Sequence, residues 1–283
     1  AVMSYLHSEF DWFPQVYATF SWGIVYGFVS GASLHREQLC LPEMAQQIAQ
    51  FLGCWHRRVK ITALQSSSPT RPSLIGGLDQ LFQNGKFCIN HLMLKIIVPL
   101  VYSSPGNATK FDQLVKHLLP ISASSSSFHR LLQVLKGEIE RRDCLVVFCH
   151  NDLLAGNIIW NEKEQKIRFI DFEYATYNYQ AYDIANHFCE FAGFTCNWSE
   201  IPGEEFQRQW ISWYLEEFNG EGEGGSDELQ IDKLLNNVRF FIPYCHLYWS
   251  LWALHQAENS VVDFDYISYA AKRLGQIQHL FLE

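Results

Sequence analysis

Two short apolar runs near the middle of the chain each end in a carboxylate. The first, Leu145–Cys149, is rich in β-branched and aromatic residues and stops at a polar cluster. The second, Ile167–Ile170, alternates apolar and polar residues, and a polar turn separates it from Ile158–Trp160. Short alternating runs around a polar turn are typical of β-hairpins. We therefore expect a hairpin whose ends bring together Asp152, Asn157 and Asp171.

Other apolar patterns predict helices and strands on either side of this hairpin. Leu41–His56 has apolar residues at a helical period, and Val238–Gln256 is apolar around most of its circumference, which is typical of a buried helix. Phe128–Arg142 is expected to be a helix that leads into the strand at Leu145. Phe13–Phe20 and Trp22–Val29 are expected to be strands joined by a tight turn.

Loops are predicted where small and polar residues replace these patterns. The stretches Gln65–Gly77, Ser122–Ser127 and Gly220–Glu228 have loop composition. Phe87–Tyr102 is more apolar, but it is too short for a membrane-spanning helix and contains a histidine and a lysine. A buried helix or an irregular segment is expected there.

The composition indicates a globular protein with a cationic ligand. The 283 residues are 48% hydrophobic and 15% aromatic, and the net charge is −9. A negative chain without a long basic run is not expected to bind nucleic acid or to insert stably into a membrane. The eight cysteines form no CxxC pair, which favours a reducing, cytoplasmic location without a zinc site.

The polar residues of the hairpin have the spacing of a phosphoryl-transfer site. The pattern is His150-x-Asp152-x-x-x-x-Asn157, followed by Ile170-Asp171-Phe172-Glu173. This is a variant of the catalytic and metal-binding motifs of kinases. Asp152 would be the catalytic base, and Asn157 and Asp171 would hold Mg²⁺ across the phosphates of ATP. The alternative is that all three are ordinary turn residues, but a turn alone does not require the second motif.

Beyond this motif, the segment from His150 to Phe194 (HNDLLAGNIIW…IDFEY…CEFAGF) resembles the choline/ethanolamine kinase family. The resemblance implies an α+β, protein-kinase-like fold of the choline kinase/aminoglycoside phosphotransferase type. It also implies ATP-dependent phosphorylation of a small amino alcohol, the first step of phosphatidylethanolamine synthesis. The CEFAGF ending is more similar to ethanolamine kinases. Choline kinase is the alternative, because a sequence does not measure the size of an amine pocket.

The resemblance also assigns ligand-binding residues. Phe28 and Val29 would lie against the adenine of ATP, and Asp183 would brace the catalytic loop, whereas His56 is given no role. The amino alcohol would bind at Glu190, Tyr174, Trp249, Trp252, Phe264, Tyr266 and Tyr269. Aromatic residues at helical spacing usually belong to a core. Walls of Trp and Tyr beside a carboxylate also bind cations, however, at about 0.5 to 2 kcal/mol per face.

The same resemblance suggests how the chain is divided. Residues 1–30 would be a remnant of the N-terminal lobe and hinge, and residues 31–283 the C-terminal lobe with the catalytic loop and amine pocket. No glycine-rich loop or strand lysine precedes Ser21, so we expect most of the small lobe to lie upstream of Ala1. A catalytically inactive isoform that binds amino alcohol or a full-length partner is a further alternative, and a dimer is left open.

Overall fold

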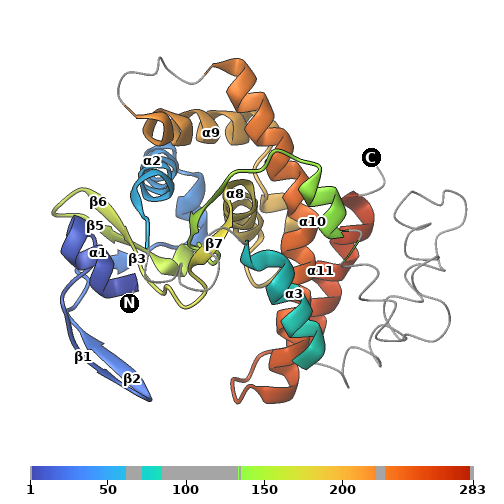
Figure 1. Ribbon diagram of the computed structural model, residues 1–283, viewed down its shortest axis with the longest axis horizontal. Helices are drawn as coiled ribbons and strands as arrows, with labels where there is room; N and C mark the ends of the chain where they lie inside the picture. The colour runs from blue at the N-terminus through green and yellow to red at the C-terminus, as the bar shows by residue number, and fades with distance from the viewer. Residues whose placement is uncertain (1, 62–71, 85–132, 134, 221–226, 281–283) are drawn as a thin grey trace, which may run out of the picture. The chain divides into compact units, whose positions relative to one another are not determined.

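The computed structural model describes residues 2–61, 72–84, 133, 135–220 and 227–280. The chain forms two compact units. Unit 1 comprises residues 1–71, 145–193 and 197–239, and unit 2 comprises residues 72–144, 194–196 and 240–283. Each unit is considered by itself below, with the element labels of Figure 1.

Unit 1 contains a three-stranded antiparallel sheet in the order β3-β5-β6. Its strands are β3 (Ala32–Ser33), β5 (Ile158–Asn161) and β6 (Lys166–Phe169). Strands β5 and β6 pair with Ile158 opposite Phe169, which confirms the predicted hairpin. Gly31 precedes β3 with φ of +131°, and a Cβ there would lie 2.4 Å from the carbonyl oxygen of Trp160. Only glycine therefore lets the chain pass so close to β5.

Two further antiparallel pairs lie in unit 1. Strand β4 (Val146–Cys149) pairs with β7 (Thr176–Tyr179), and β1 (Val16–Phe20) pairs with β2 (Gly23–Tyr26). The predicted N-terminal strands are therefore present but shorter than expected. In Figure 1 the β1–β2 hairpin is the blue ribbon that extends away from β5 and β6, and every side chain of β2 is exposed.

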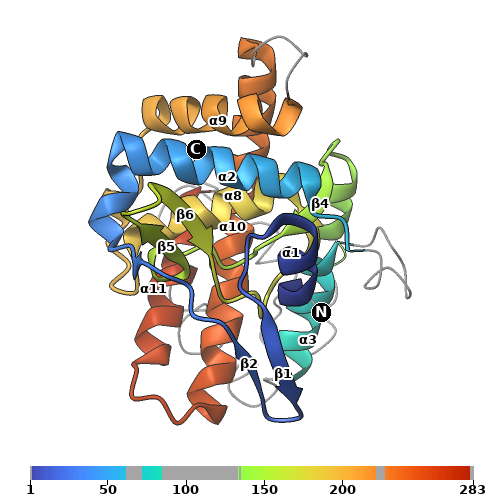
Figure 2. The ribbon, with the colours of Figure 1, turned by 90° about the vertical axis from the view of Figure 1, so that its left-hand side faces the viewer.

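Helices cover the sheets of unit 1. The long ones are α1 (Val2–Phe10), α2 (Pro42–Arg58), α8 (Gln180–Cys189) and α9 (Glu204–Asn219). Short 3₁₀ turns occur at η1 (Arg36–Cys40), η4 (Ala155–Asn157), η5 (Glu190–Ala192) and η6 (Trp198–Glu200). Figure 2 shows α9 running alongside α2. They approach closely at Gly53, where a Cβ would lie 2.4 Å from the carbonyl oxygen of Tyr214.

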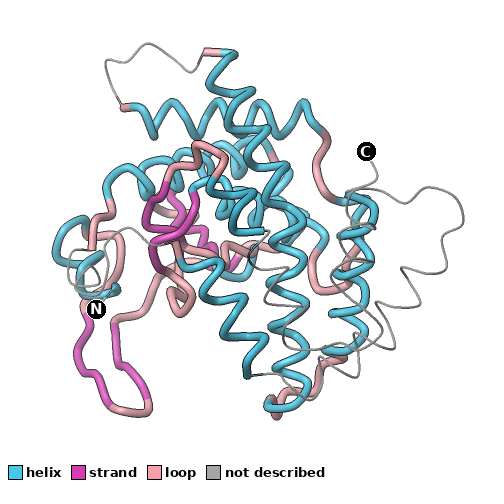
Figure 3. The backbone as a smooth tube through the Cα atoms, turned by 45° about the vertical axis from the view of Figure 1, so that its right-hand side comes forward, coloured by secondary structure: helices cyan, strands magenta, loops and turns pink. Residues whose placement is uncertain are grey.

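Unit 2 consists of helices and loops in its described residues (Figure 3). The helices are α3 (Ser73–Asn84), the second half of α10 (Glu228–Asn259) and α11 (Tyr266–Leu280). Helix α10 begins earlier than the predicted Val238–Gln256 and continues through Pro243. Residues 135–140 are helical, in agreement with the expected helix at Phe128–Arg142.

Helix α3 corrects one prediction, because it begins inside the expected loop Gln65–Gly77. The glycine pair and Pro72 suggested a loop, but Leu74 and Leu78 lie four residues apart on one buried face. Gly77 has a packing role, since a Cβ there would lie 3.0 Å from the ring of Tyr248. The burial of these leucines outweighs the weak helix propensity of glycine.

Other predictions fall partly or wholly outside the described residues. These are the segment Phe87–Tyr102, the loop Ser122–Ser127 and most of the loop Gly220–Glu228, whose last residue begins α10. Within the ranges that the structure describes, no helix is both long and apolar enough to cross a membrane.

Candidate active site

The first part of the site is the loop that follows β4. His150 and Asn151 are buried there, and Asp152 is half-buried. Asn151 has φ of +65°, a left-handed conformation that Asn adopts more easily than most residues. The His150 ring donates from Nε2 to the carbonyl of Ile170 at 2.9 Å, and its Nδ1 accepts from the Asp152 N–H at 3.3 Å. Burial lowers the pKa of His150, which is consistent with this neutral, bonded ring.

Helix α8 holds the loop in place through Asp183. Its carboxylate accepts the backbone N–H of His150 at 2.8 Å and that of Asn151 at 2.7 Å. Further along α8, Asn186 donates to the carbonyl of Asn151 and His187 donates to that of Leu153. Asp183 thus braces the loop, as the sequence led us to expect.

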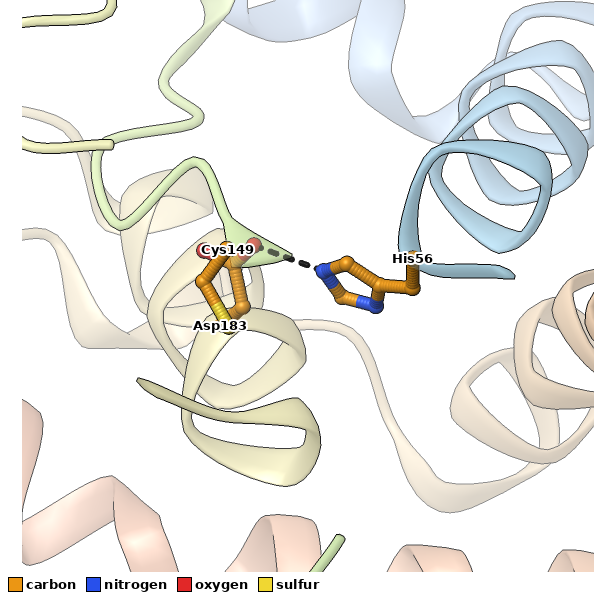
Figure 4. Close-up of side chains that lie close together, drawn as sticks. All are labelled: His56, Cys149 and Asp183. Carbon is orange, nitrogen blue, oxygen red and sulfur yellow. Dashed lines mark hydrogen bonds and ion pairs between the residues drawn. The ribbon is translucent and has the colours of Figure 1, made fainter. Parts of the chain in front are cut away.

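Asp183 also belongs to a buried group with His56 and Cys149 (Figure 4). Their possible ligand atoms lie within 4.8 Å of one another. Each is already hydrogen-bonded, because His56 donates to Asp183 at 2.9 Å and the Cys149 thiol donates to the carbonyl of Tyr179 at 3.5 Å.

The thiol of this group does not have the protonation state of a metal ligand. Burial and the charge of Asp183 hold the pKa of the Cys149 thiol well above its usual value, so it is not the thiolate that a metal prefers. Burial tends to raise the pKa of Asp183, but the hydrogen bond and charge of His56 hold it below its usual value. We interpret the group as a structural support of the loop.

Asp152 and Asn157 lie in direct contact. The Asn157 side-chain amide donates to the backbone carbonyl of Asp152 at 2.8 Å and to its carboxylate Oδ2 at 3.1 Å. Asn157 is the last residue of η4, and its own carbonyl accepts the N–H of Ile170 at 3.0 Å. These bonds connect the loop to the end of β6, where Asp171 follows.

Asp171 lies two residues after the end of β6 and has φ of +63°. Non-glycine residues rarely adopt this conformation, which recurs at functional sites. Its side chain is exposed, and in the described part of the chain neither of its carboxylate oxygens accepts a hydrogen bond.

Neighbouring carboxylates change the acidity of Asp152. Burial, followed by the charges of Glu190, Asp171 and Glu173, raises the pKa of Asp152 to about 8, and the Asn157 amide offsets only part of this. The pKa of Glu173 is itself raised by burial and by Asp171, and Tyr174 partly offsets this shift through a hydrogen bond. The carboxyl groups of Asp152, Asp171, Glu173 and Glu190 therefore lie near one another. Such a cluster favours the binding of a cation.

The donor set fits a hard divalent cation. Because the Asn157 NH₂ group is directed to Asp152, the amide oxygen is left for another partner, and the described residues offer it no donor. Carboxylate and amide oxygens are the ligands that Mg²⁺ prefers. Asn157 and Asp171 could therefore hold such an ion.

Glu190 is buried, with 7% of its surface exposed. It begins η5 directly after α8. Arg36 supports this turn by donating from Nη1 to the carbonyl of Ala192 at 3.2 Å. Tyr174 is half-buried, and its backbone carbonyl accepts a bond from Asn151 at 2.9 Å. The sequence-predicted residues Asp152, Asn157, Asp171, Glu190 and Tyr174 are thus all in unit 1.

The predicted aromatic residues form a continuous series of ring contacts in unit 2. Trp249 and Trp252 lie 5.3 Å apart, and Trp252 lies 5.8 Å from Tyr266. Phe264 contacts both Tyr266 and Tyr269, at 4.9 and 5.7 Å. Trp249 and Tyr269 are buried, whereas Trp252, Phe264 and Tyr266 are partly exposed. The partly exposed rings are the ones available to a ligand.

The two predicted adenine contacts lie between β2 and β3. Phe28 is 84% exposed, and Val29 is partly exposed. Neither residue touches the carboxylate cluster in any contact that the structure shows. Their role stays a prediction.

Sequence reasoning missed two residues of this site. The charge of Glu173 raises the pKa of Asp152. Its position two residues after Asp171 could have identified it as a site residue. Arg36 was not found because its contact with Ala192 joins residues far apart in the sequence.

Comparisons with known proteins show which family the chain is similar to. The family model described as choline/ethanolamine kinase matches residues 1–278. An ethanolamine kinase of Drosophila melanogaster is 36% identical over 265 residues, which cover 93% of this chain and 47% of the relative. Ethanolamine kinase 1 of Mus musculus is 35% identical over 266 residues, which cover 93% of this chain and 67% of the relative. The chain therefore spans about half the length of the Drosophila relative.

A solved structure supports the fold. The ethanolamine kinase of Plasmodium vivax superimposes with a TM-score of 0.73 at 28% identity, covering 98% of this chain and 69% of that chain. The protein-kinase-like fold expected from the sequence is thereby confirmed.

Proposed function

Because this chain belongs to the choline/ethanolamine kinase family, we propose that the protein transfers the γ-phosphate of ATP to the hydroxyl of ethanolamine. The product is phosphoethanolamine, and the reaction is the first step of phosphatidylethanolamine synthesis. The observation that carries the proposal is the half-buried Asp152, held by the amide of Asn157 and surrounded by Asp171, Glu173 and Glu190. The three relatives named above are all ethanolamine kinases, so choline is not favoured as the substrate.

Asp152 is proposed as the catalytic base. It would orient the substrate hydroxyl and accept its proton as the oxygen attacks the γ-phosphorus and ADP leaves. Asn157 fixes the carboxylate through the bond from its NH₂ group. An ammonium beside Glu190 would offset one of the charges that raise the pKa of Asp152.

Asn157 and Asp171 are proposed to hold Mg²⁺. When bound, the ion would neutralise charge on the transferred phosphate. Glu173 stands close enough to Asp171 and Asp152 to affect their electrostatics and would add negative charge beside the ion.

The substrate ammonium is proposed to bind through Glu190 and Tyr174, which both belong to unit 1. The roles of Trp249, Trp252, Phe264, Tyr266 and Tyr269 stay proposals that come from the resemblance to the family. Glu190 is a buried carboxylate, and a carboxylate attracts an ammonium ion. A primary ammonium with its three N–H donors also suits carboxylate and hydroxyl acceptors. The expected adenine contacts of Phe28 and Val29 stay proposals, as do the lobe division at residues 30 and 31 and a dimer.

An assay of phosphoethanolamine formation from ethanolamine and Mg·ATP tests this function. Replacing the base (Asp152→Asn) is expected to lower turnover by roughly three orders of magnitude or more, with the amine affinity retained, because the carboxylate acts in the transition state. Asp171→Asn is expected to lower turnover similarly and to raise the Mg²⁺ concentration required.

The matched control is Glu162→Gln, which removes an exposed carboxylate from the turn between β5 and β6. It should leave turnover unchanged. Turnover of the Asp152→Asn variant within a few-fold of the unmodified protein would show that Asp152 is not the base. If the unmodified protein forms no phosphoethanolamine, the proposed function is wrong for this chain.

A further inference from the structure

A cleft of about 480 Å³ lies in unit 1, and none of the active-site carboxylates lines it. Its walls come from the end of α1, from α2, from β6 and from α9. Pockets of roughly 300 to 1,000 Å³ commonly bind small molecules and cofactors. The nature of the lining side chains therefore decides which molecule fits.

One face of α2 supplies the uncharged polar groups of the cleft, and its charged lining residues are Asp11, Lys166, Arg168 and Glu217. Gln47, Gln50, Phe51 and Cys54 follow the spacing of residues that share a helix face. Both glutamine side chains are only partly exposed. Neither amide makes a hydrogen bond to any residue that the structure describes, so both keep donors and acceptors for a ligand.

Aromatic rings form a second wall. Trp12 lies edge-on to Phe51 with ring centroids 5.1 Å apart, and Phe10 stacks on Trp12 at 4.4 Å. The Arg58 guanidinium sits 4.8 Å from the Phe10 ring and 5.5 Å from the Trp12 ring. The Trp12 ring is partly exposed and also lies nearly parallel to the ring of Trp55, with centroids 6.3 Å apart. These neighbours fix it as an aromatic surface of the cleft.

Positive charge lies on the β6 side of the cleft. Lys166 is exposed and forms no ion pair with the residues described. Arg168 lies on the same strand, and Glu164 already binds it at 2.9 Å. Lys166 is therefore the cation that is available to an incoming anion.

We propose that this cleft binds a nucleotide, at a site separate from that of the ATP substrate. The base stacks against Trp12 and Phe51, its polar edge pairs with Gln47 and Gln50, and its phosphate binds Lys166. Stacking on aromatic rings combined with a cation for the phosphate is a general means of holding nucleotides. Unbonded amides within the cleft suit a heterocycle better than an apolar peptide.

The test is a calorimetric titration of the unmodified protein with adenosine and cytidine 5′-monophosphates. It is run with a metal chelator and without amino alcohol, so that its outcome does not depend on turnover. Saturable binding is expected. Lys166→Glu should weaken it about tenfold or more, as expected for loss of a charge-assisted bond. Gln50→Leu should weaken it as well, and thermal melts confirm that each variant is folded.

The matched control is Lys163→Glu, which makes the same charge change in the turn before β6 but outside the cleft. It should change the affinity less than about twofold, since exposed charges are largely screened. Equal effects of the two lysine variants, or no saturable binding, would overturn the proposal. So would inorganic phosphate binding as tightly as the nucleotides, or a loss caused by Asp171→Asn instead of Lys166→Glu.

Discussion

At the scale of single residues, the site depends on backbone groups that side chains hold in place. Asp183 is completely buried, and its oxygens accept the N–H groups of His150 and Asn151 and the ring of His56. The His187 ring donates from Nδ1 to the carbonyl of Leu153. These bonds hold the left-handed turn at Asn151, which prepares Asp152 for its proposed role.

The buried His187 predicts how stability depends on pH. Burial lowers its pKa to about 4, whereas an unfolded histidine titrates near pH 6.5. Below about pH 6.5 the unfolded chain binds a proton that the folded protein does not. The free energy of unfolding should therefore be unaffected by this group at higher pH and should fall by roughly 3 kcal/mol as the pH drops to 4.

Urea unfolding at several pH values, compared with His187→Asn, measures this contribution. The asparagine keeps a donor for Leu153 but cannot be protonated, so part of the loss at low pH should disappear. His35→Asn, at an exposed histidine, is the control and should leave the pH dependence intact. An identical pH dependence in the unmodified protein and His187→Asn would contradict this prediction.

At the scale of elements, some features could be predicted from the sequence and others could not. The β5–β6 hairpin has alternating apolar residues around a short turn, and α2 has apolar residues at a helical period. Neighbouring residues were therefore enough to predict both elements. Strand β7 was missed because it contains Asn178 between two tyrosines and pairs with β4, about thirty residues away. Helix α3 was not predicted because its two glycines are typical of a loop. Glu190 was assigned to the site by the resemblance to the family, since the neighbouring phenylalanines fit either a buried or an exposed glutamate.

The aromatic residues of α10 predict two different mutational effects. Trp249 is 5% exposed and contacts Tyr248 and Trp252, so Trp249→Ala should lower the free energy of unfolding by roughly 3 to 5 kcal/mol. Trp252 is partly exposed. Trp252→Ala should instead weaken ethanolamine binding by about 0.5 to 2 kcal/mol if its ring faces the ammonium.

Thermal melts and calorimetric titrations of both variants separate these effects. Trp252→Phe keeps an aromatic face and should recover part of the affinity. Unchanged ethanolamine affinity in Trp252→Ala would show that this ring only packs within unit 2.

At the scale of the whole molecule, charge matters more than any one contact. The net charge of −9 produces a negative potential that attracts an ammonium before it reaches the site and repels a polyanion. The same excess was visible in the sequence. The predicted hairpin brought Asp152 and Asp171 together, whereas the effect of Glu173 and Glu190 on Asp152 was found only from the fold.

This potential predicts opposite salt effects on the two proposed substrates. Raising the ionic strength from about 0.01 M to about 0.15 M shortens the Debye length from about 30 Å to about 8 Å. The KM for ethanolamine should then rise roughly threefold, because long-range attraction is screened. The KM for Mg·ATP, which is anionic, should stay constant or fall. Glu190→Gln should keep part of the salt dependence, since the remaining carboxylates still attract the amine. A KM for ethanolamine that does not change with salt would mean that only the buried contacts select the cation.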